Sequence, residues 1–283
     1  MNPRPPVNHF DASPTAPTPS KLVKPITTPQ KCLPKSSSSA TPKATTTLPD
    51  PQLTPLGESQ CLALRDSLRR RFDAVPAQDT AVVVSPMVRT MQTAVLALDW
   101  LAAKGVVFEA SADWQGELLP SPLPLKTRAD MEPWTIPPLN ARVAENSADP
   151  CDVGTPLARL QPAWPQISFA RLDPVWPDKT SAAATRYAHA RSAVVERGRL
   201  CLEDLYRRPE KVVFVVSHSG FLRAGCVGWW FFNSDYRIFE FEDRLGEDGR
   251  RVVRQDESTL EGGLGLSWAE RVPLGDGLPD LRN

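Results

Sequence analysis

His218 and Arg89 are the two residues whose types and positions best suit chemistry. His218 follows five apolar residues at 212–216 and precedes Ser219 and Gly220, which is typical of a buried parallel strand that ends in a polar turn. Ligands of open α/β sheets bind at this carboxyl edge of the strands. A histidine placed there can donate a hydrogen bond or transfer a proton. The alternative is a histidine that only caps the following turn.

The other histidines have less suitable surroundings. The chain contains three histidines, of which His9 lies in a low-complexity segment and His189 lies within a helical pattern. His218 is therefore the histidine that we expect to take part in chemistry.

Arg89 lies in the first turn of a helix that we expect over 88–104, directly after an apolar strand at 80–84. A cation is unfavourable in this turn because the helix dipole is positive there. The position therefore suits an arginine that binds an anion. An ordinary surface arginine is the alternative, and the local pattern fits it equally well.

The elements that must position these two residues alternate along the chain. Thr54 followed by Pro55 predicts the start of a helix, and apolar residues recur after it at the spacing of one helix face. The remaining expected elements are a strand at 106–110, helices at 181–207 and 220–229, an edge strand at 236–241 and a weak strand at 251–254. This order predicts an α/β fold, namely a three-layer α/β/α sandwich with a mostly parallel sheet.

Two stretches interrupt this pattern. Residues 1–48 are rich in Pro, Ser, Thr and Lys, and such a segment cannot bury enough apolar surface to offset its ordering entropy. We therefore expect a disordered tail over 1–48 and a single domain over 49–283. Residues 113–178 contain many prolines, several tryptophans and little periodicity, which predicts an irregular insert or a lid.

The composition limits the partners of the chain. Lys and Arg together number 33, as do Asp and Glu, so the formal net charge is zero. This balance argues against nucleic acid or an anionic membrane as the main partner. The five cysteines have no CxxC spacing, so we expect no metal site. With no apolar N-terminal segment, we expect a cytoplasmic protein; the oligomeric state is not indicated.

Five short stretches carry motifs in a consistent order: Leu53-Thr-Pro-Leu-Gly-Glu-Ser-Gln60, Ser85-Pro-Met-Val-Arg-Thr-Met-Gln-Thr93, Glu145-Asn-Ser-Ala-Asp-Pro-Cys-Asp-Val-Gly154, Val216-Ser-His-Ser-Gly-Phe-Leu222 and Asn233-Ser-Asp-Tyr-Arg-Ile-Phe-Glu-Phe241. Together they resemble the histidine phosphatase superfamily, and most closely its fungal phosphoglycerate-mutase-like branch. The resemblance covers about residues 48–115 and 145–245. Each stretch alone is weakly diagnostic, whereas five in the family's order are specific.

The resemblance implies a phosphomonoesterase that acts on a small phosphorylated metabolite and needs no metal or cofactor. It assigns Arg89 to clamping the phosphate, because a guanidinium matches phosphate oxygens with paired hydrogen bonds. It assigns His218 to stabilising charge on the transferred phosphoryl group, and Ser219 to the same phosphate site. Glu145 is the implied general acid, which would need a raised pKa, and Glu117 is the alternative.

The family pattern fails at its first motif. Histidine phosphatases open with a strand that ends in Arg-His-Gly or Arg-His-Ala, whose histidine becomes phosphorylated. Here Arg4 and His9 are the only arginine and histidine before Leu53, and neither follows an apolar run. We therefore expect a fold that lacks its first strand and a phosphatase that is impaired. The alternative is a catalytically inactive relative that binds phosphate or a partner protein.

A second departure separates Gln115 from Glu145. The family joins an aromatic-Gln-Glu sequence directly to its Pro-Cys-Asp loop, whereas here residues 116–144 intervene. Deleting them would restore the family sequence, so we interpret 116–144 as an insertion of the kind that a translated intron produces. A transcript that spans both junctions as translated here would refute the intron interpretation.

Overall fold

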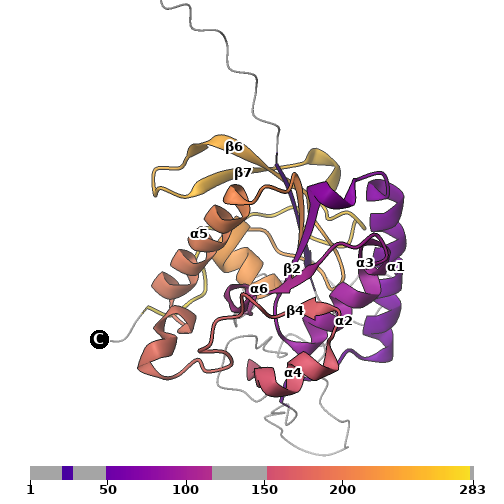
Figure 1. The fold of residues 1–283 in the computed structure, drawn as a ribbon. Coiled ribbons are helices and arrows are strands. Elements are labelled where there is room, and N and C mark those ends of the chain that lie inside the picture. The colour runs from indigo at the N-terminus through magenta and orange to yellow at the C-terminus, as the bar shows by residue number, and fades with distance from the viewer. Residues whose placement is uncertain (1–20, 28–48, 117–151, 281–283) are drawn as a thin grey trace, which may run out of the picture.

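The computed structural model describes residues 21–27, 49–116 and 152–280 of the chain. A seven-stranded sheet forms its centre in the order β4-β3-β2-β5-β1-β6-β7, and helices cover both faces (Figure 1). Strands from β4 to β1 pair in parallel, whereas β6 and β7 run antiparallel. The predicted α/β sandwich with a mostly parallel sheet is confirmed. The strands are β1 (Leu22–Thr27), β2 (Thr80–Val84), β3 (Phe108–Ala110), β4 (Ile167–Ser168), β5 (Val212–Ser217), β6 (Phe239–Leu245) and β7 (Arg251–Gln255).

Two apolar layers join the sheet to its helices. One layer packs against α1 (Pro55–Phe72), α2 (Val88–Ala97), α3 (Asp99–Ala102) and α4 (Leu157–Ala163). The other packs against α5 (Arg191–Arg207), α6 (Ser219–Phe221) and the π-helical turn η5 (Leu222–Val227). The carboxyl ends of the parallel strands therefore meet at one edge, between the two helical layers.

Among the residues that the structure describes, no helix combines the length and the apolar character needed to cross a membrane.

The structure confirms the predicted start of α1 and the predicted strand β2. Thr54 Oγ1 accepts a hydrogen bond from the Gly57 N–H at 3.2 Å, and Pro55 opens the helix. A hydroxyl cap and a proline at the first position suit the unpaired N–H groups of a helix start. β2 covers the predicted residues and is buried along its whole length.

The helix predicted over 88–104 is interrupted at Leu98. The backbone of Leu98 leaves the helical region, with φ −124° and ψ 20°. Asp99 Oδ1 then accepts the Trp100 N–H at 2.7 Å. A side chain that binds a neighbouring backbone group competes with helix continuation, so α2 and α3 form as two separate helices.

The helix predicted over 181–207 also divides. Its first part forms the short 3-10 turn η4 (Ala182–Tyr187), and α5 begins only at Arg191. The Arg191 N–H donates to the carbonyl of Pro279 at 2.8 Å. The start of α5 is therefore fixed by a C-terminal segment that local periodicity cannot reveal.

Residues of the helix predicted over 220–229 form α6 and the wider turn η5. A Cβ added to Gly198 of α5 would stand 1.8 Å from the carbonyl oxygen of Gly225 in η5. Only glycine at position 198 allows the two elements to pack this closely.

The strand predicted at the sheet edge over 236–241 begins at Phe239 and continues to Leu245 as β6. β6 lies between β1 and β7. The prediction of an edge position was wrong because β7 folds back as a hairpin partner and covers the outer side of β6.

β1 corrects the prediction that the fold lacks its first strand. Leu22–Thr27 pairs in parallel with β5 at all six residues and lies between β5 and β6. Part of the tail predicted over 1–48 is therefore a central strand of the domain. The tail residues 1–20 and 28–48 lie outside the described part of the chain.

Lys24 and Pro25 explain why β1 is hard to recognise in the sequence. Pairing of β1 with β6 is limited to two residue pairs. Farther along, the Arg237 N–H donates to the Pro25 carbonyl at 3.1 Å, but Pro25 has no N–H to return. Lys24 is fully buried with its Nζ 4.0 Å from the Phe72 ring centroid, and this Nζ has no hydrogen-bond partner among the described residues.

The region predicted as an irregular insert over 113–178 is partly built into the domain. Its described part contains α4 and also β4, which pairs in parallel with β3 at one end of the sheet. Trp176 is buried, and its indole N–H donates to the Thr155 carbonyl at 3.0 Å. Residues 117–151 lie outside the described part of the chain.

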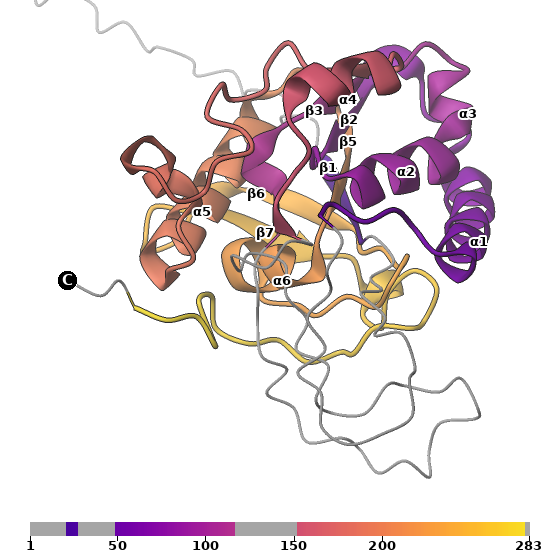
Figure 2. The same cartoon turned by 90° about the horizontal axis from the view of Figure 1, so that it is seen from below.

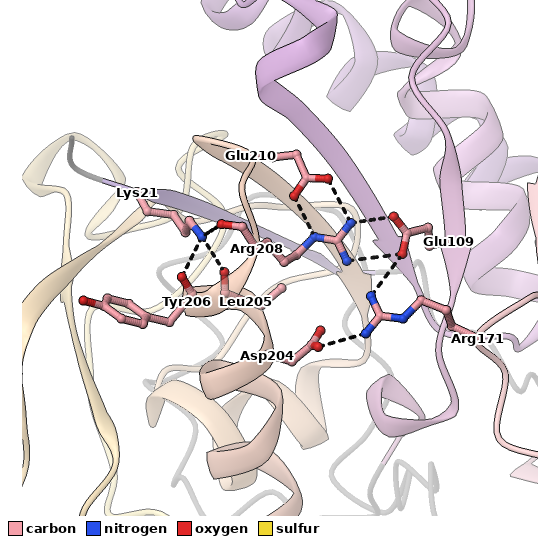
Figure 3. A network of polar contacts seen from close by, with 8 residues as sticks. All are labelled: Lys21, Glu109, Arg171, Asp204, Leu205, Tyr206, Arg208 and Glu210. Atoms are coloured by element: carbon pink, nitrogen blue, oxygen red, sulfur yellow. Dashed lines mark hydrogen bonds and ion pairs between the residues drawn. The ribbon is translucent and has the colours of Figure 1, made fainter. Parts of the chain in front are cut away.

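An ion-pair network joins β3, the segment after β4 and the amino end of β5 to α5 (Figure 3). Arg208, just before β5, binds the carboxylates of Glu109 and Glu210, each through two nitrogen–oxygen contacts. Arg171 lies 3.5 Å from Glu109 and 3.0 Å from Asp204. The network connects elements that are distant in the sequence.

Lys21 fastens the start of β1 to the same region (Figure 3). Its Nζ donates to the carbonyls of Leu205 at 3.0 Å and Tyr206 at 2.7 Å, and to that of Arg208. The last carbonyls of a helix lack partners within the helix and carry the negative end of its dipole. A lysine therefore suits this place at the end of α5, although burial lowers its pKa.

Candidate functional site

The structure brings Arg89 and His218 into contact. β2 and β5 are parallel neighbours, so α2 and α6 begin at the same edge of the sheet (Figure 2). Arg89 Nη2 lies 3.4 Å from His218 Nδ1. The histidine has no exposed surface and the arginine is 5% exposed. The structure thus brings together the two side chains that the sequence singled out, and their roles toward a ligand stay predictions.

Ser85 and Asp152 also contact this pair. Ser85 Oγ lies 3.0 Å from His218 Nε2, and the backbone of Ser85 donates to the carbonyl of Val216 in β5. Asp152 Oδ1 lies 3.6 Å from Arg89 Nη2. Both side chains are fully buried, so the site holds a charged pair and a neutral hydrogen-bonded pair away from water.

His218 is held in its neutral form. Burial places the pKa of its imidazole well below the usual range, and the cations Arg89, Lys179 and Arg197 lower it further. The Arg89 guanidinium can only donate, so Nδ1 must accept from it. The proton of the neutral imidazole is therefore on Nε2, which donates to Ser85 Oγ.

Arg197 of α5 adds a second buried guanidinium near the site. Its Nη2 donates to the Gln115 carbonyl at 3.3 Å, and its Cζ lies 4.3 Å from the ring centroid of Phe221. Burial lowers the pKa of Arg197 to about 10, which still leaves it charged at neutral pH. The surroundings of His218 are thus strongly positive, as an anion site requires.

Asp50 connects the two segments that carry the charged pair. Its Oδ1 accepts the Val88 N–H at the start of α2, and its Oδ2 accepts the Thr155 N–H, both at 2.8 Å. Burial raises the pKa of Asp50, while these two hydrogen bonds and Arg89 oppose the rise. The carboxylate therefore fixes the helix that presents Arg89 against the loop that presents Asp152.

Among the other predicted site residues, Ser219 has its hydroxyl bonded to the backbone of another loop. The Ser219 hydroxyl donates to the Phe231 carbonyl at 2.9 Å and accepts the Phe231 N–H at 3.3 Å. Its predicted contact with a phosphate remains a prediction. Glu145 and its alternative Glu117 both lie outside the described residues.

The described residues contain no group of three or more His, Cys, Asp or Glu side chains that could hold a metal ion.

The end of β1 is the place where the family resemblance expects Arg-His. Thr27 pairs with Ser217, and the next residue in the sequence is Thr28, which lies outside the described part. The strand expected by the resemblance is therefore present, but its sequence ends in threonines where the family has the arginine and the nucleophilic histidine.

Sequence reasoning missed Ser85, Asp152 and Asp50 as parts of the site. Ser85 directly follows the strand at 80–84, and Asp152 directly follows a proline-cysteine pair. Both lie inside the family motifs, and these positions could have identified them as site residues. Asp50 offers no comparable signal, because its role depends on two backbone groups from different loops.

The solved structures with a similar fold are only distantly related. A mycobacterial protein described as hydrolase 2 is 14% identical, with a TM-score of 0.42 over 84% of this chain and 89% of its own. An ecdysone phosphate phosphatase from Bombix mori, solved with tungstate, is 14% identical, with a TM-score of 0.45 over 82% and 92%. A phosphoglycerate mutase from Bacillus anthracis str. Sterne is 13% identical, with a TM-score of 0.39 over 84% and 94%. These similarities are too weak to assign a function.

Sequence comparison gives a more specific result. No curated protein sequence matches the chain. The family model of the histidine phosphatase superfamily (branch 1) matches residues 39–113, which include β2 and the first part of the candidate site with Ser85 and Arg89. Over these residues the chain is similar to the histidine phosphatase superfamily (branch 1).

Proposed function

We propose that this chain binds phosphomonoesters at the Arg89–His218 site and is an impaired phosphomonoesterase of the histidine phosphatase type. The observation that supports this most directly is the buried contact of the two side chains at 3.4 Å at the carboxyl edge of the sheet. A guanidinium and an imidazole at this distance can bind neighbouring oxygens of one phosphate. The fungal phosphoglycerate-mutase-like branch, a small phosphorylated metabolite as substrate and a cytoplasmic location belong to the same proposal.

The residues have separate roles in this proposal. Arg89 neutralises charge on the phosphate, and Asp152 holds the guanidinium in place. His218 donates a hydrogen bond to a phosphoryl oxygen and stabilises the charge that develops in transfer. Glu145, or in its place Glu117, protonates the leaving oxygen.

Among the described residues, β1 ends without the histidine that the family resemblance expects, and this limits what the site can catalyse. A covalent phosphohistidine needs a second imidazole opposite His218, and β1 ends in threonine at Thr27. Loss of a covalent nucleophile costs other enzymes about 10⁶ in turnover. Each charge-assisted hydrogen bond still contributes about 1.5–3 kcal/mol to binding, so binding survives where hydrolysis does not. The alternative function, an inactive phosphate-binding or protein-interaction relative, follows from the same feature.

Calorimetric binding of inorganic phosphate and hydrolysis of p-nitrophenyl phosphate by the full chain test the proposal. We expect Arg89→Ala and His218→Ala each to weaken phosphate binding about tenfold or more. Arg159→Ala removes an exposed arginine of α4 and should leave binding unchanged. Phosphate binding that both site variants retain would contradict the proposal.

The rate of p-nitrophenyl phosphate hydrolysis distinguishes the impaired enzyme from the inactive relative. Slow hydrolysis that is lost in His218→Ala supports an impaired enzyme. Phosphate binding without any hydrolysis supports the inactive relative.

A further inference from the structure

A group of aromatic side chains lies on the surface of two loops near the carboxyl edge of the parallel strands. The rings of Trp230 and Trp268 stack with their centroids 4.2 Å apart and 20° between their planes. Phe232 meets Trp230 edge to face at 5.8 Å. Trp268 is 37% exposed and its neighbour Leu266 is 47% exposed. We call Trp230, Phe232 and Trp268 the aromatic cluster.

The chain direction places this cluster at the edge that carries His218. β6 runs antiparallel to β1, and Tyr236, before β6, bridges to Ile26 near the end of β1. Residues that precede Tyr236 therefore lie beyond the carboxyl end of β1. β1 and β5 are parallel, so this is also the edge at which β5 delivers His218.

Two contacts show that the segment 229–234 crosses this edge. Phe231 exchanges two hydrogen bonds with the hydroxyl of Ser219, the residue after His218. Ser234 Oγ lies 3.8 Å from the Cys61 sulfur in α1. The aromatic cluster therefore lies at the same edge of the sheet as the candidate phosphate site.

Buried polar groups hold the cluster in a fixed arrangement. Arg237 is fully buried, and its Nη2 donates to the carbonyls of Trp230 at 2.7 Å and Trp268 at 2.6 Å. The Phe232 N–H donates to Ser267 Oγ at 3.0 Å. A rigid stacked pair with one partly exposed ring offers a flat surface at low cost in conformational entropy.

We propose that the aromatic cluster binds the organic part of the phosphate ester, and that the preferred ligands are phosphate esters of aromatic alcohols. This inference rests on the proposed function, because the phosphate must be held by Arg89 and His218. With the phosphate fixed there, a flat ring attached to it is directed along the edge where Trp268 presents its exposed face. Stacking on that face, rather than charge, selects the ligand.

Calorimetry with two matched ligands tests this inference. 1-Naphthyl phosphate carries an aromatic ring, whereas glycerol 3-phosphate carries the same phosphate on an aliphatic alcohol. We expect the full chain to bind the naphthyl ester about tenfold more tightly. In Trp268→Leu the ratio of the two dissociation constants should fall to about one. Leu245→Ala, which removes a similarly exposed apolar side chain at the far end of β6, should leave the ratio unchanged.

The outcomes separate this inference from the proposed function. Equal affinity for the two esters, or a preference that Trp268→Leu retains, would overturn the aromatic preference and leave the phosphate site intact. A naphthyl preference that depends on Trp268 while Arg89→Ala and His218→Ala bind both esters normally would support the stacking surface and refute the phosphate site. No binding of either ester would refute both.

Discussion

At the scale of single residues, the protonation of His218 decides how the site meets an anion. Burial and the neighbouring cations keep the imidazole neutral, with Nδ1 accepting from Arg89 and Nε2 donating to Ser85. An anion that displaces the Nδ1 contact needs a donor in that place, and a nearby negative charge raises the pKa of histidine. Anion binding should therefore bring a proton to His218.

The uptake of this proton can be measured with sulfate as the anion. Sulfate itself does not titrate near neutral pH, so any proton taken up on binding goes to the protein. We expect calorimetry at pH 6.5, in two buffers of different ionisation enthalpy, to show net proton uptake, and the affinity to fall as the pH rises. His218→Gln should remove the uptake. Sulfate binding with no proton uptake in the unaltered chain would show that the imidazole stays neutral or does not face the anion.

Single residues also mark the limit of prediction at the site. Arg89 and His218 could be predicted because His218 directly follows a recognisable strand and Arg89 lies in the first turn of the helix after another. The contact of Arg89 with Asp152 could not, since the two residues come from segments whose approach depends on the whole fold. Ser219 is assigned to the phosphate site because it lies inside a family motif. In the structure, however, its hydroxyl is bonded to the backbone of Phe231.

At the scale of elements, β1 contains an unusual buried charge. Burial, together with Arg71, lowers the pKa of Lys24 to about 7, while Asp256 opposes the shift. The unfolded chain keeps this lysine protonated up to its ordinary pKa of 10.5. Between these values the unfolded state binds more protons than the folded state, so the free energy of unfolding must rise with pH across this window.

Lys24→Met should remove this dependence. The unaltered chain should gain up to about 1.4 kcal/mol of stability per pH unit between about pH 7 and 10.5 from Lys24, measured relative to Lys24→Met by urea unfolding. The variant should be more stable at pH 7, since methionine fills the space beside Phe72 and Phe214 without a charge. Parallel stability curves for the two proteins would contradict a buried lysine at this position.

The elements that could be predicted are those with uniform local signals. β2 and β5 are runs of apolar residues, and α1 has both a cap and a regular apolar face. β1 could not be predicted, because Lys24 and Pro25 break the apolar pattern and a proline argues against a central strand. β1 is stabilised as a strand by its pairing with β5, which the residues of β1 alone do not indicate.

At the scale of the whole molecule, the Arg208 network joins the sheet to α5 at the edge opposite the site. The Arg208 side chain is 8% exposed, and its carboxylate partners Glu109 and Glu210 are also largely buried. Removing a buried cation leaves its partner charges uncompensated, which costs about 3–5 kcal/mol in other proteins.

Arg208→Ala should therefore lower the free energy of unfolding by about 3 kcal/mol, at the low end because both carboxylates keep some contact with water. Arg207→Ala is the matched control, since that neighbouring side chain is 76% exposed and pairs with Glu203 at the surface. Its effect should stay within about 0.5 kcal/mol. Equal effects of the two substitutions in urea unfolding would show that the network adds nothing to stability.

The central place of β1 also governs when the chain can complete its fold during synthesis. The Lys21 contact with the end of α5 joins residues 184 positions apart, and β6 and β7 reach the rest of the sheet only through β1 among the described strands. A nascent chain must therefore carry β1 without its partner β5 until residues 212–217 have left the ribosome. Such late, long-range closure is slow and leaves apolar strand edges exposed to aggregation, so this protein should depend on chaperones for its yield more than a protein of the same size whose neighbouring strands are consecutive.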